Sequence, residues 1–309
     1  MALDVRPIIP SRFFGQKPRG TASTSRIGAY IALMKLRVVE LLLVTTVPTM
    51  VLADGGWPSI QLMAVTLICG TLAAGGANAI NMYIDRDIDK LMVRTQNRPL
   101  VTGVLTPKAA MMFAIVLEIV AFCVLWAGAN LLAAVLAVSA TLFYVFVYSL
   151  WLKRTSRQNI VIGGAAGAMP VLVGWAAVTN SLGWAPIVLF IVIFLWTPPH
   201  FWALAIRHAD DYKAAGVPML PVVVSLERTV RSMTMYAVLL TLFTLVLVPV
   251  AELGWIYGIT ALVFGVAFVI GSARLGSEPS PKRSMRLFTF SITYVTAVFV
   301  ALTVDVLLR

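Results

Sequence analysis

The sequence predicts an all-α, polytopic membrane protein with about nine transmembrane helices. Three observations lead to this prediction. First, 60% of the 309 residues are hydrophobic and only 12% are charged, which is about half of the roughly 25% charged residues of a soluble domain. Second, the mean hydropathy is +0.92. Third, long apolar stretches recur along the chain. This composition excludes a disordered chain, a disulfide-rich scaffold and an ordinary cytosolic enzyme.

A membrane-spanning helix needs about 20 mostly apolar residues. Nine stretches meet this requirement, with ends predicted to within a few residues. They lie near residues 36–53, 59–80, 109–128, 131–151, 160–179, 184–205, 233–251, 254–272 and 286–307. The connections near 129–130, 180–183 and 252–253 are very short, whereas those after the second and sixth spans have about 28 residues each. We therefore expect the functional site on the face that carries the long connections.

The basic residues orient these spans. Of the 24 Lys and Arg residues, 23 fall on the face with the long connections, and only Arg309 falls on the other. The positive-inside rule assigns the basic face to the cytoplasm. This predicts a cytoplasmic N-terminus and a multi-pass protein of the cell inner (cytoplasmic) membrane, with the mitochondrial inner membrane as the alternative. Because the net charge of +11 is spread over five separate segments, we expect no nucleic-acid partner.

Two regions divide the chain. Residues 1–30 are predicted to form a basic, disordered cytoplasmic tail, and residues 31–309 the membrane domain. No apolar stretch follows the first basic residues directly, which argues against a signal peptide. A mitochondrial transit peptide is the alternative reading of the tail.

An acidic motif follows the second span. Asn81, Asp85 and Asp89 recur every four residues, so on a continuous helix they share one face. Carboxylates at a membrane boundary are costly and favour a bound cation, and sparse oxygen ligands suit Mg²⁺. Asp87 points away and is expected to be solvated or paired with an arginine. The alternative is a charged helix end that pairs locally with Arg86, Lys90 and Arg94.

Two arginines, Arg94 and Arg98, lie just beyond the acidic motif in the sequence Arg-Thr-Gln-Asn-Arg-Pro-Leu. Acids that hold Mg²⁺ beside guanidinium donors make a natural diphosphate site. The pattern Asn-x-x-x-Asp-x-x-x-Asp followed by Arg-Thr-x-x-Arg-Pro-Leu resembles the first aspartate-rich motif of the UbiA superfamily of intramembrane prenyltransferases.

Two further segments resemble one branch of that superfamily, which attaches a farnesyl chain to heme b. They are residues 152–170 and residues 197–221, the latter with Thr-Pro-Pro-His-Phe-Trp and Asp-Asp-Tyr-Lys-Ala-Ala-Gly. The likeness runs from about Lys35 to Pro221. It implies nine helices around a central cavity that opens to the cytoplasm, with the ends of spans two and six facing each other across it.

The second acidic segment departs from the superfamily pattern. Many members carry a second Asp-x-x-x-Asp here, but Arg207 and Ala215 stand four residues before and after Asp211. Asp211 is predicted either to bind Mg²⁺ or to orient Lys213 and Arg207. The resemblance thus implies one set of metal-binding and catalytic residues, with Mg²⁺ as the cofactor: Asn81, Asp85, Asp89 and Asp211.

Basic side chains near the acidic motifs are predicted to bind diphosphate, although positive-inside topology alone explains most loop charges. Lys35 and Arg37 resemble the Lys-Pro-Arg of the family, with Leu36 in place of proline. The predicted diphosphate-binding residues are Arg37, Arg94, Arg98, Lys153, Arg154 and Lys213.

Five other residues receive separate predictions. His200 and Tyr212 are candidates for contacting heme; the alternative for His200 is a hydrogen-bonded residue beside the Pro198-Pro199 helix break. Gly163 and Gly167 form a Gly-x-x-x-Gly pattern that predicts close helix packing. Glu118, in the middle of a span, is expected to face the interior, without an assigned role.

The resemblance implies a reaction. Metal and basic residues would stabilise the departing diphosphate of farnesyl diphosphate, and aromatic side chains would shield the allylic cation. A vinyl group of heme b would then attack, and water would complete the product, heme O. The aromatic candidates are Tyr83, Phe143, Tyr144, Tyr148 and Trp202.

The implied partners are heme b and farnesyl diphosphate as substrates, membrane lipid, and a hand-over to heme A synthase or to heme–copper oxidase assembly. Two alternatives remain open from the sequence. One is a prenyltransferase that acts on an aromatic quinone precursor. The other is a membrane transporter, against which the acidic residues cluster at one interface rather than at the bilayer midplane.

Overall fold

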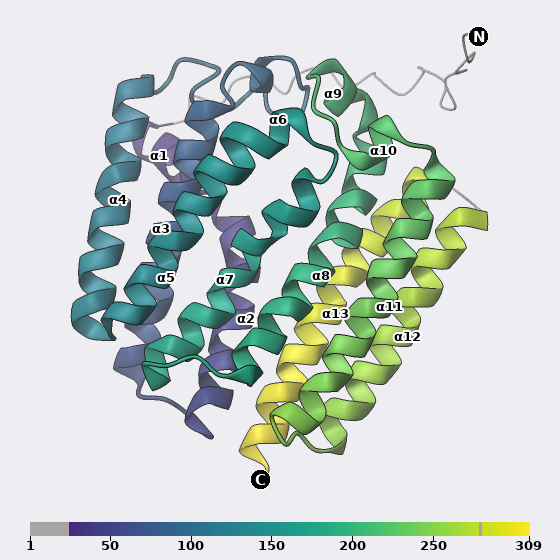
Figure 1. The fold of residues 1–309 in the computed structure, drawn as a ribbon. Coiled ribbons are helices and arrows are strands. Elements are labelled where there is room, and N and C mark those ends of the chain that lie inside the picture. The colour runs from purple at the N-terminus through teal and green to yellow at the C-terminus, as the bar shows by residue number, and fades with distance from the viewer. Residues whose placement is uncertain (1–24, 278–279) are drawn as a thin grey trace.

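The computed structural model describes residues 25–277 and 280–309, of which residues 37, 38, 40–43 and 277 are described by their backbone alone. Within these ranges every regular element is helical (Figure 1), so the predicted all-α class is confirmed. Residues 1–24, most of the predicted tail, lie outside the described part. Residues 26–30, which were also assigned to the tail, instead belong to helix α1 (Arg26–Met34).

Eight helices of the described part are long and apolar enough to cross a membrane. The ninth predicted span coincides with helix α2 (Leu36–Asp54), whose crossing of the membrane stays a prediction. One of the eight, residues 131–155, is built from α5 (Leu131–Leu142), the π-helix η2 (Phe143–Leu152) and α6 (Lys153–Thr155). The others are α3 (Ile60–Ile84), α4 (Pro107–Gly128), α7 (Asn159–Thr179), α8 (Trp184–Arg207), α11 (Leu226–Val250), α12 (Trp255–Ser277) and α13 (Pro281–Leu307).

The connections after α3, α6 and α8 meet at one end of the bundle, which we call the basic end (Figure 1). It also carries the short helices η1 (Ile88–Lys90), α9 (Ala209–Ala214) and α10 (Leu220–Val223). At this end, helices extend beyond their apolar stretches: α11 begins at Leu226 rather than near 233, and α13 at Pro281 rather than near 286. The side chains of Ser225 and Ser280 cap these starts by accepting a backbone N–H, which stabilises a helix in polar surroundings.

The helices pack as two groups that share a boundary. In the first, α3 packs on α4, α4 on α5, and α5 on α7; in the second, α8, α11, α12 and α13 pack together. The groups meet where α7 packs on α8 and where α2 lies against both α7 and α13. The C-terminal ends of α3, η2 and α8 are far apart in the sequence, and this packing brings them together at the basic end of the bundle (Figure 1).

Polar side chains fix the opposite end. Asn130 caps α5 through the Ala133 N–H and donates to the Ala176 carbonyl at the end of α7, at 2.7 Å. Asp305 on α13 accepts the Gly254 and Tyr257 N–H groups at 2.8 and 2.9 Å. Because those N–H groups belong to the start of α12, Asp305 joins the last two helices while it caps one of them.

Candidate active site

The acidic motif lies at the basic end, where α3 stops. The sequence predicted one continuous helix through Asn81, Asp85 and Asp89, but α3 ends at Ile84 and Asp89 belongs to the 3₁₀ helix η1. The Asp89 N–H still donates to the Asp85 carbonyl at 2.8 Å, which is the spacing of a helical turn. The turn therefore keeps both carboxylates at one site even though the helix is interrupted.

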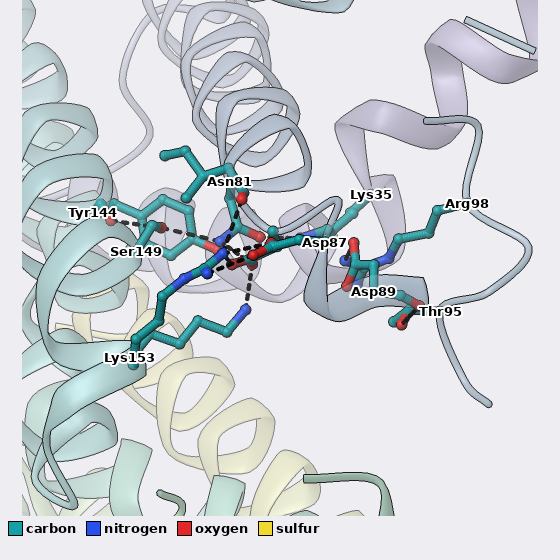
Figure 2. Close-up of polar contacts among 12 residues, drawn as sticks. Lys35, Asn81, Asp87, Asp89, Thr95, Arg98, Tyr144, Ser149 and Lys153 are labelled. Carbon is teal, nitrogen blue, oxygen red and sulfur yellow. Dashed lines mark hydrogen bonds and ion pairs between the residues drawn. The ribbon is translucent and has the colours of Figure 1, made fainter. Parts of the chain in front are cut away.

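Asp85 is the centre of the site and is fully buried. Its Oδ2 atom accepts from Lys153 Nζ and, at 2.8 Å, from Asn81 Nδ2. Its Oδ1 atom has no hydrogen-bond partner and lies 3.9 Å from the guanidinium of Arg154. Figure 2 shows the side chains of Asn81, Ser149 and Lys153 pointing toward one another.

Asp89 is also buried, and again one of its carboxylate oxygens is bound while the other has no hydrogen-bond partner. Arg98 binds its Oδ2 atom at 2.5 Å, and the Thr95 hydroxyl donates to its backbone carbonyl at 2.8 Å. Its Oδ1 atom has no hydrogen-bond partner. Arg98, one of the predicted diphosphate-binding residues, therefore lies beside the acidic motif (Figure 2).

Lys35 joins the site from the junction of α1 and α2, and it was not among the predicted site residues. Its Nζ donates to Asn81 Oδ1 at 3.0 Å. Burial, with the positive charges of Arg98 and Lys153, lowers the pKa of Lys35 to about 7. Its backbone is left-handed, with φ 52°, which is unfavourable for a residue with a side chain. The side chain of Arg37, which was predicted, lies outside the described residues.

The π-helix η2 supplies the opposite wall. Tyr144 and Tyr148 stack at 5.3 Å, and Ser149 donates to the Tyr144 carbonyl while accepting from Asn81 Nδ2 at 3.0 Å. π-Helices are rare and are often found at functional sites. Ser149 was not predicted, although it lies four residues before Lys153, about one helical turn, and this spacing was an available signal.

The two glycines of the Gly-x-x-x-Gly pattern have different surroundings in the structure. A Cβ atom at Gly163 would lie 2.3 Å from Cδ2 of Tyr148, whereas one at Gly167 would meet nothing within 4 Å. Close packing is thus confirmed for Gly163 and wrong for Gly167.

Gly163→Ala should therefore displace the Tyr148 ring and lower the activity of the site about tenfold or more, because a rigid aromatic ring cannot yield that far. Gly167→Ala is the matched control. It should leave activity unchanged and raise stability by up to about 1 kcal/mol, because alanine favours helix. Steady-state rates and thermal unfolding in detergent measure both effects. Equal losses in the two variants would contradict the packing argument.

Arg154 and Asp87 form a separate pair at the edge of the site. Two guanidinium nitrogens of Arg154 reach the two Asp87 oxygens at 2.7 Å each, and one also donates to the Ile84 carbonyl. These bonds hold the pKa of Asp87 well below its usual range. Asp87 is thus paired with an arginine, which was one of its two predicted states.

The second acidic segment lies on α9, at the basic end of the bundle (Figure 1). Burial together with the positive charge of Arg94 lowers the pKa of His208. Asp211 lies 3.9 Å from His208 Nδ1, and no bond from it to Lys213 or Arg207 occurs in the described part. Lys213 is exposed. Roles for Asp211 and Lys213 in the site stay predictions.

His200 is held within the protein between α8 and α13. Its Nδ1 atom is hydrogen-bonded to Ser291 Oγ at 2.6 Å, and its ring stacks on Trp196 and Phe288 with centroids at 4.1 and 4.5 Å. The hydrogen bond matches the alternative prediction for His200, but the predicted helix break is wrong, because α8 continues without interruption through Pro198 and Pro199. Contact with heme stays a prediction and would have to use Nε2.

Of the predicted aromatic wall, Tyr144 and Tyr148 are at the site. Tyr83 instead stacks under the Arg86 guanidinium at 4.5 Å, and Trp202 packs edge-on against Tyr236.

The residues present fit a divalent metal ion. Mg²⁺ binds oxygen and usually keeps water or substrate phosphate among its ligands. The two unpartnered oxygens, Oδ1 of Asp85 and Oδ1 of Asp89, are buried, and a buried carboxylate oxygen without a partner is costly. Within the described ranges no three His, Cys, Asp or Glu side chains group as a metal site. The two carboxylates would therefore rely on phosphate and water oxygens to complete the coordination.

Comparison with known proteins adds independent findings. The sequence profile described as the UbiA prenyltransferase family matches residues 42–296. Curated relatives named protoheme IX farnesyltransferase include one from Parafrankia sp. (strain EAN1pec), 54% identical over 94% of this chain and 95% of its own length. Another is from Frankia alni, 54% identical over 91% of this chain and 98% of its own length.

Solved structures show the same fold. A structure from work on digeranylgeranylglyceryl phosphate synthase in membranes has a TM-score of 0.76 at 18% identity, covering 92% of this chain and 99% of the other. A UbiA homolog from Archaeoglobus fulgidus bound to DMAPP and Mg²⁺ has a TM-score of 0.66 at 17% identity, covering 89% and 99%. At these identities the likeness concerns the fold alone.

Proposed function

The chain belongs to the UbiA prenyltransferase family, and on that premise we propose that it transfers the farnesyl group of farnesyl diphosphate to a vinyl group of heme b. Water adds in the same reaction, giving heme O and diphosphate. The names of relatives that match more than nine-tenths of the chain support this acceptor.

The observation that carries the proposal is the arrangement of charge around Asp85 and Asp89. Each carboxylate has one oxygen bound by a basic side chain and one buried oxygen without a partner. Asp85 and Asp89 would hold Mg²⁺, and a bound metal ion stabilises the negative charge of a departing diphosphate. Asn81 Oδ1 already accepts a hydrogen bond from Lys35, which leaves one lone pair of the amide oxygen for a metal ion.

This chain's residues then divide the work of binding and transfer. Lys153, Arg98 and Lys35, which already contact Asp85, Asp89 and Asn81, bind the diphosphate oxygens. The bond between C1 of the farnesyl group and the diphosphate oxygen breaks, and C1 bonds to the terminal vinyl carbon of heme. Tyr144 and Tyr148, stacked and buried, shield the allylic cation through their π-faces. Water bonds to the inner vinyl carbon, and its proton leaves to solvent.

Heme contacts follow from the same placement. Tyr212 is half-buried and packs against the same hydrophobic core cluster as Tyr148, so we assign it to the porphyrin. We further propose that the basic end faces the cytoplasm of the cell inner membrane, in line with the positive-inside rule. Heme O would then be handed over in the membrane to heme A synthase or to heme–copper oxidase assembly.

The test is an assay of the purified protein with heme b, farnesyl diphosphate and Mg²⁺, read by mass spectrometry. We expect a heme product that has gained a farnesyl group and water. Chelation with EDTA should reduce product to background, and added Mg²⁺ should restore it. The reason is that the metal ion neutralises the negative charge of the departing diphosphate. Prenylation of 4-hydroxybenzoate in place of heme would overturn the acceptor. A folded protein that prenylates neither would overturn prenyl transfer itself.

A further inference from the structure

Glu118 lies near the middle of α4, deep in a membrane span, where an acidic side chain is costly and is usually kept for a function. It is not part of the charge cluster at the basic end. Its carboxylate is partly buried and accepts a hydrogen bond at Oε1 from the Thr141 hydroxyl on α5, at 3.1 Å. A polar contact between α4 and α5 is therefore present within the membrane span.

The same carboxylate lies against α3. A Cβ atom built on Gly76 would be 2.7 Å from Glu118 Oε1 and 3.1 Å from the Ala114 carbonyl. Only glycine leaves room for the carboxylate between α3 and α4 at this position, since real Cβ atoms do not approach so closely. Glu118 thus touches α3 and α5 at once while it belongs to α4.

These two helices carry the two sides of the candidate active site. Asn81 lies five residues after Gly76 on α3. Ser149 lies eight residues after Thr141, on η2, which continues α5. On α3, five residues are roughly one and a half helical turns, whereas Ser149 is reached through the π-helix η2. Asn81 Nδ2 and Ser149 Oγ meet at 3.0 Å, and Asp85 and Lys153 meet one turn further on.

We propose that Glu118 is a positioning residue for the acidic motif. Glu118 fills the space over Gly76 on α3 and hydrogen-bonds to Thr141 on α5. It thereby fixes the position of α3 relative to α5 and η2, so that Asn81 reaches Ser149. Asn81 in turn holds Oδ2 of Asp85 at 2.8 Å. The inference rests on the proposed function, because it assigns Glu118 a role in binding the metal–diphosphate group.

The experiment measures Mn²⁺ binding by electron paramagnetic resonance, with farnesyl diphosphate present and heme absent. This readout needs no turnover, so it is independent of the heme acceptor. Glu118→Leu should weaken Mn²⁺ binding about fivefold to tenfold, the effect of one lost hydrogen-bonded contact. Glu118→Gln keeps the shape and an acceptor oxygen, so it should stay within about twofold of the parent. Thr141→Val should resemble Glu118→Leu, and Ser139→Ala, on the exposed side of α5, should have no effect.

A double variant tests the route of action. In a Ser149→Ala background, Glu118→Leu should cost less than about twofold, since the contact that it positions is already gone. Thermal unfolding of each variant confirms that it is folded, and Thr141→Val serves if Glu118→Leu is not. Independent multiplication of the Glu118 and Ser149 effects would overturn the proposal, as would equal losses in Glu118→Gln and Glu118→Leu. If the parent binds Mn²⁺ but no heme is prenylated, the proposed acceptor fails while this inference can still be judged.

Discussion

Asp85→Asn should reduce prenyl transfer by on the order of 10³, because it removes both the charge that we propose to bind the metal ion and the partner of Lys153. Asparagine keeps the size of the side chain, so the change is one of charge and of oxygen donors. The Lys153 ammonium would remain at the site without its carboxylate. The expected signature is a fall in kcat together with a higher Mg²⁺ requirement, measured by product formation across a magnesium titration.

Asp87→Asn is the matched control for this prediction. Asp87 lies two residues away, its side chain is 60% exposed, and it pairs with Arg154 rather than with the buried cluster. We expect a loss of no more than about threefold, as is usual for an exposed ion pair. Comparable losses at Asp85 and Asp87 would show that general negative charge, rather than the buried carboxylate, sustains the reaction.

Asp305→Ala should have the largest effect on stability, with a loss of about 2–4 kcal/mol in the free energy of unfolding. The buried carboxylate accepts two backbone N–H groups at the start of α12 and the guanidinium of Arg309. Alanine would leave those N–H groups without side-chain partners and remove this polar contact between α13 and α12. Reversible unfolding in mixed detergent measures the change. Activity of the folded fraction should be unchanged, because Asp305 lies at the end opposite the acidic motif.

Arg309→Ala separates the cap from the ion pair. Arg309 is partly exposed, so its removal should cost less than about 1 kcal/mol. A loss at Arg309 as large as that at Asp305 would mean that the ion pair, and not the capping of α12, stabilises this end.

Much of the fold could be predicted because the bilayer imposes a length on apolar segments. Predicted spans and observed helices agree closely at the end opposite the site, for example at Thr179 and Trp184. They differ at the basic end, where α11 starts at Leu226 and α13 at Pro281. Hydropathy reports where the apolar environment ends, whereas helix ends depend on capping, here by Ser225 and Ser280. The small helix α1 was missed because it is neither long nor continuously apolar.

The site was predicted where spacing along one helix encodes it, as for Asn81 and Asp85. It was not predicted where contacts depend on packing between distant elements. Lys35, in a left-handed conformation between α1 and α2, contacts Asn81 from 46 residues away in the sequence. Nothing in local sequence shows that His200 faces Ser291 on α13, 91 residues away. The interruption of α3 before Asp89 was missed because four-residue spacing fits both a helix and a turn that preserves helical geometry.

The π-helix η2 makes chain length in this segment as important as residue identity. Its wide turns allow Tyr144, Tyr148 and Ser149 to face the site and still deliver Lys153 to Asp85. Loss of a single residue between them would turn everything that follows by about 100° and carry Lys153 to another face. When relatives are aligned, a gap within residues 143–152 therefore deserves as much weight as a substitution of the acidic motif. The number of residues in this segment therefore fixes the position of Lys153 as strictly as the sequence fixes its identity.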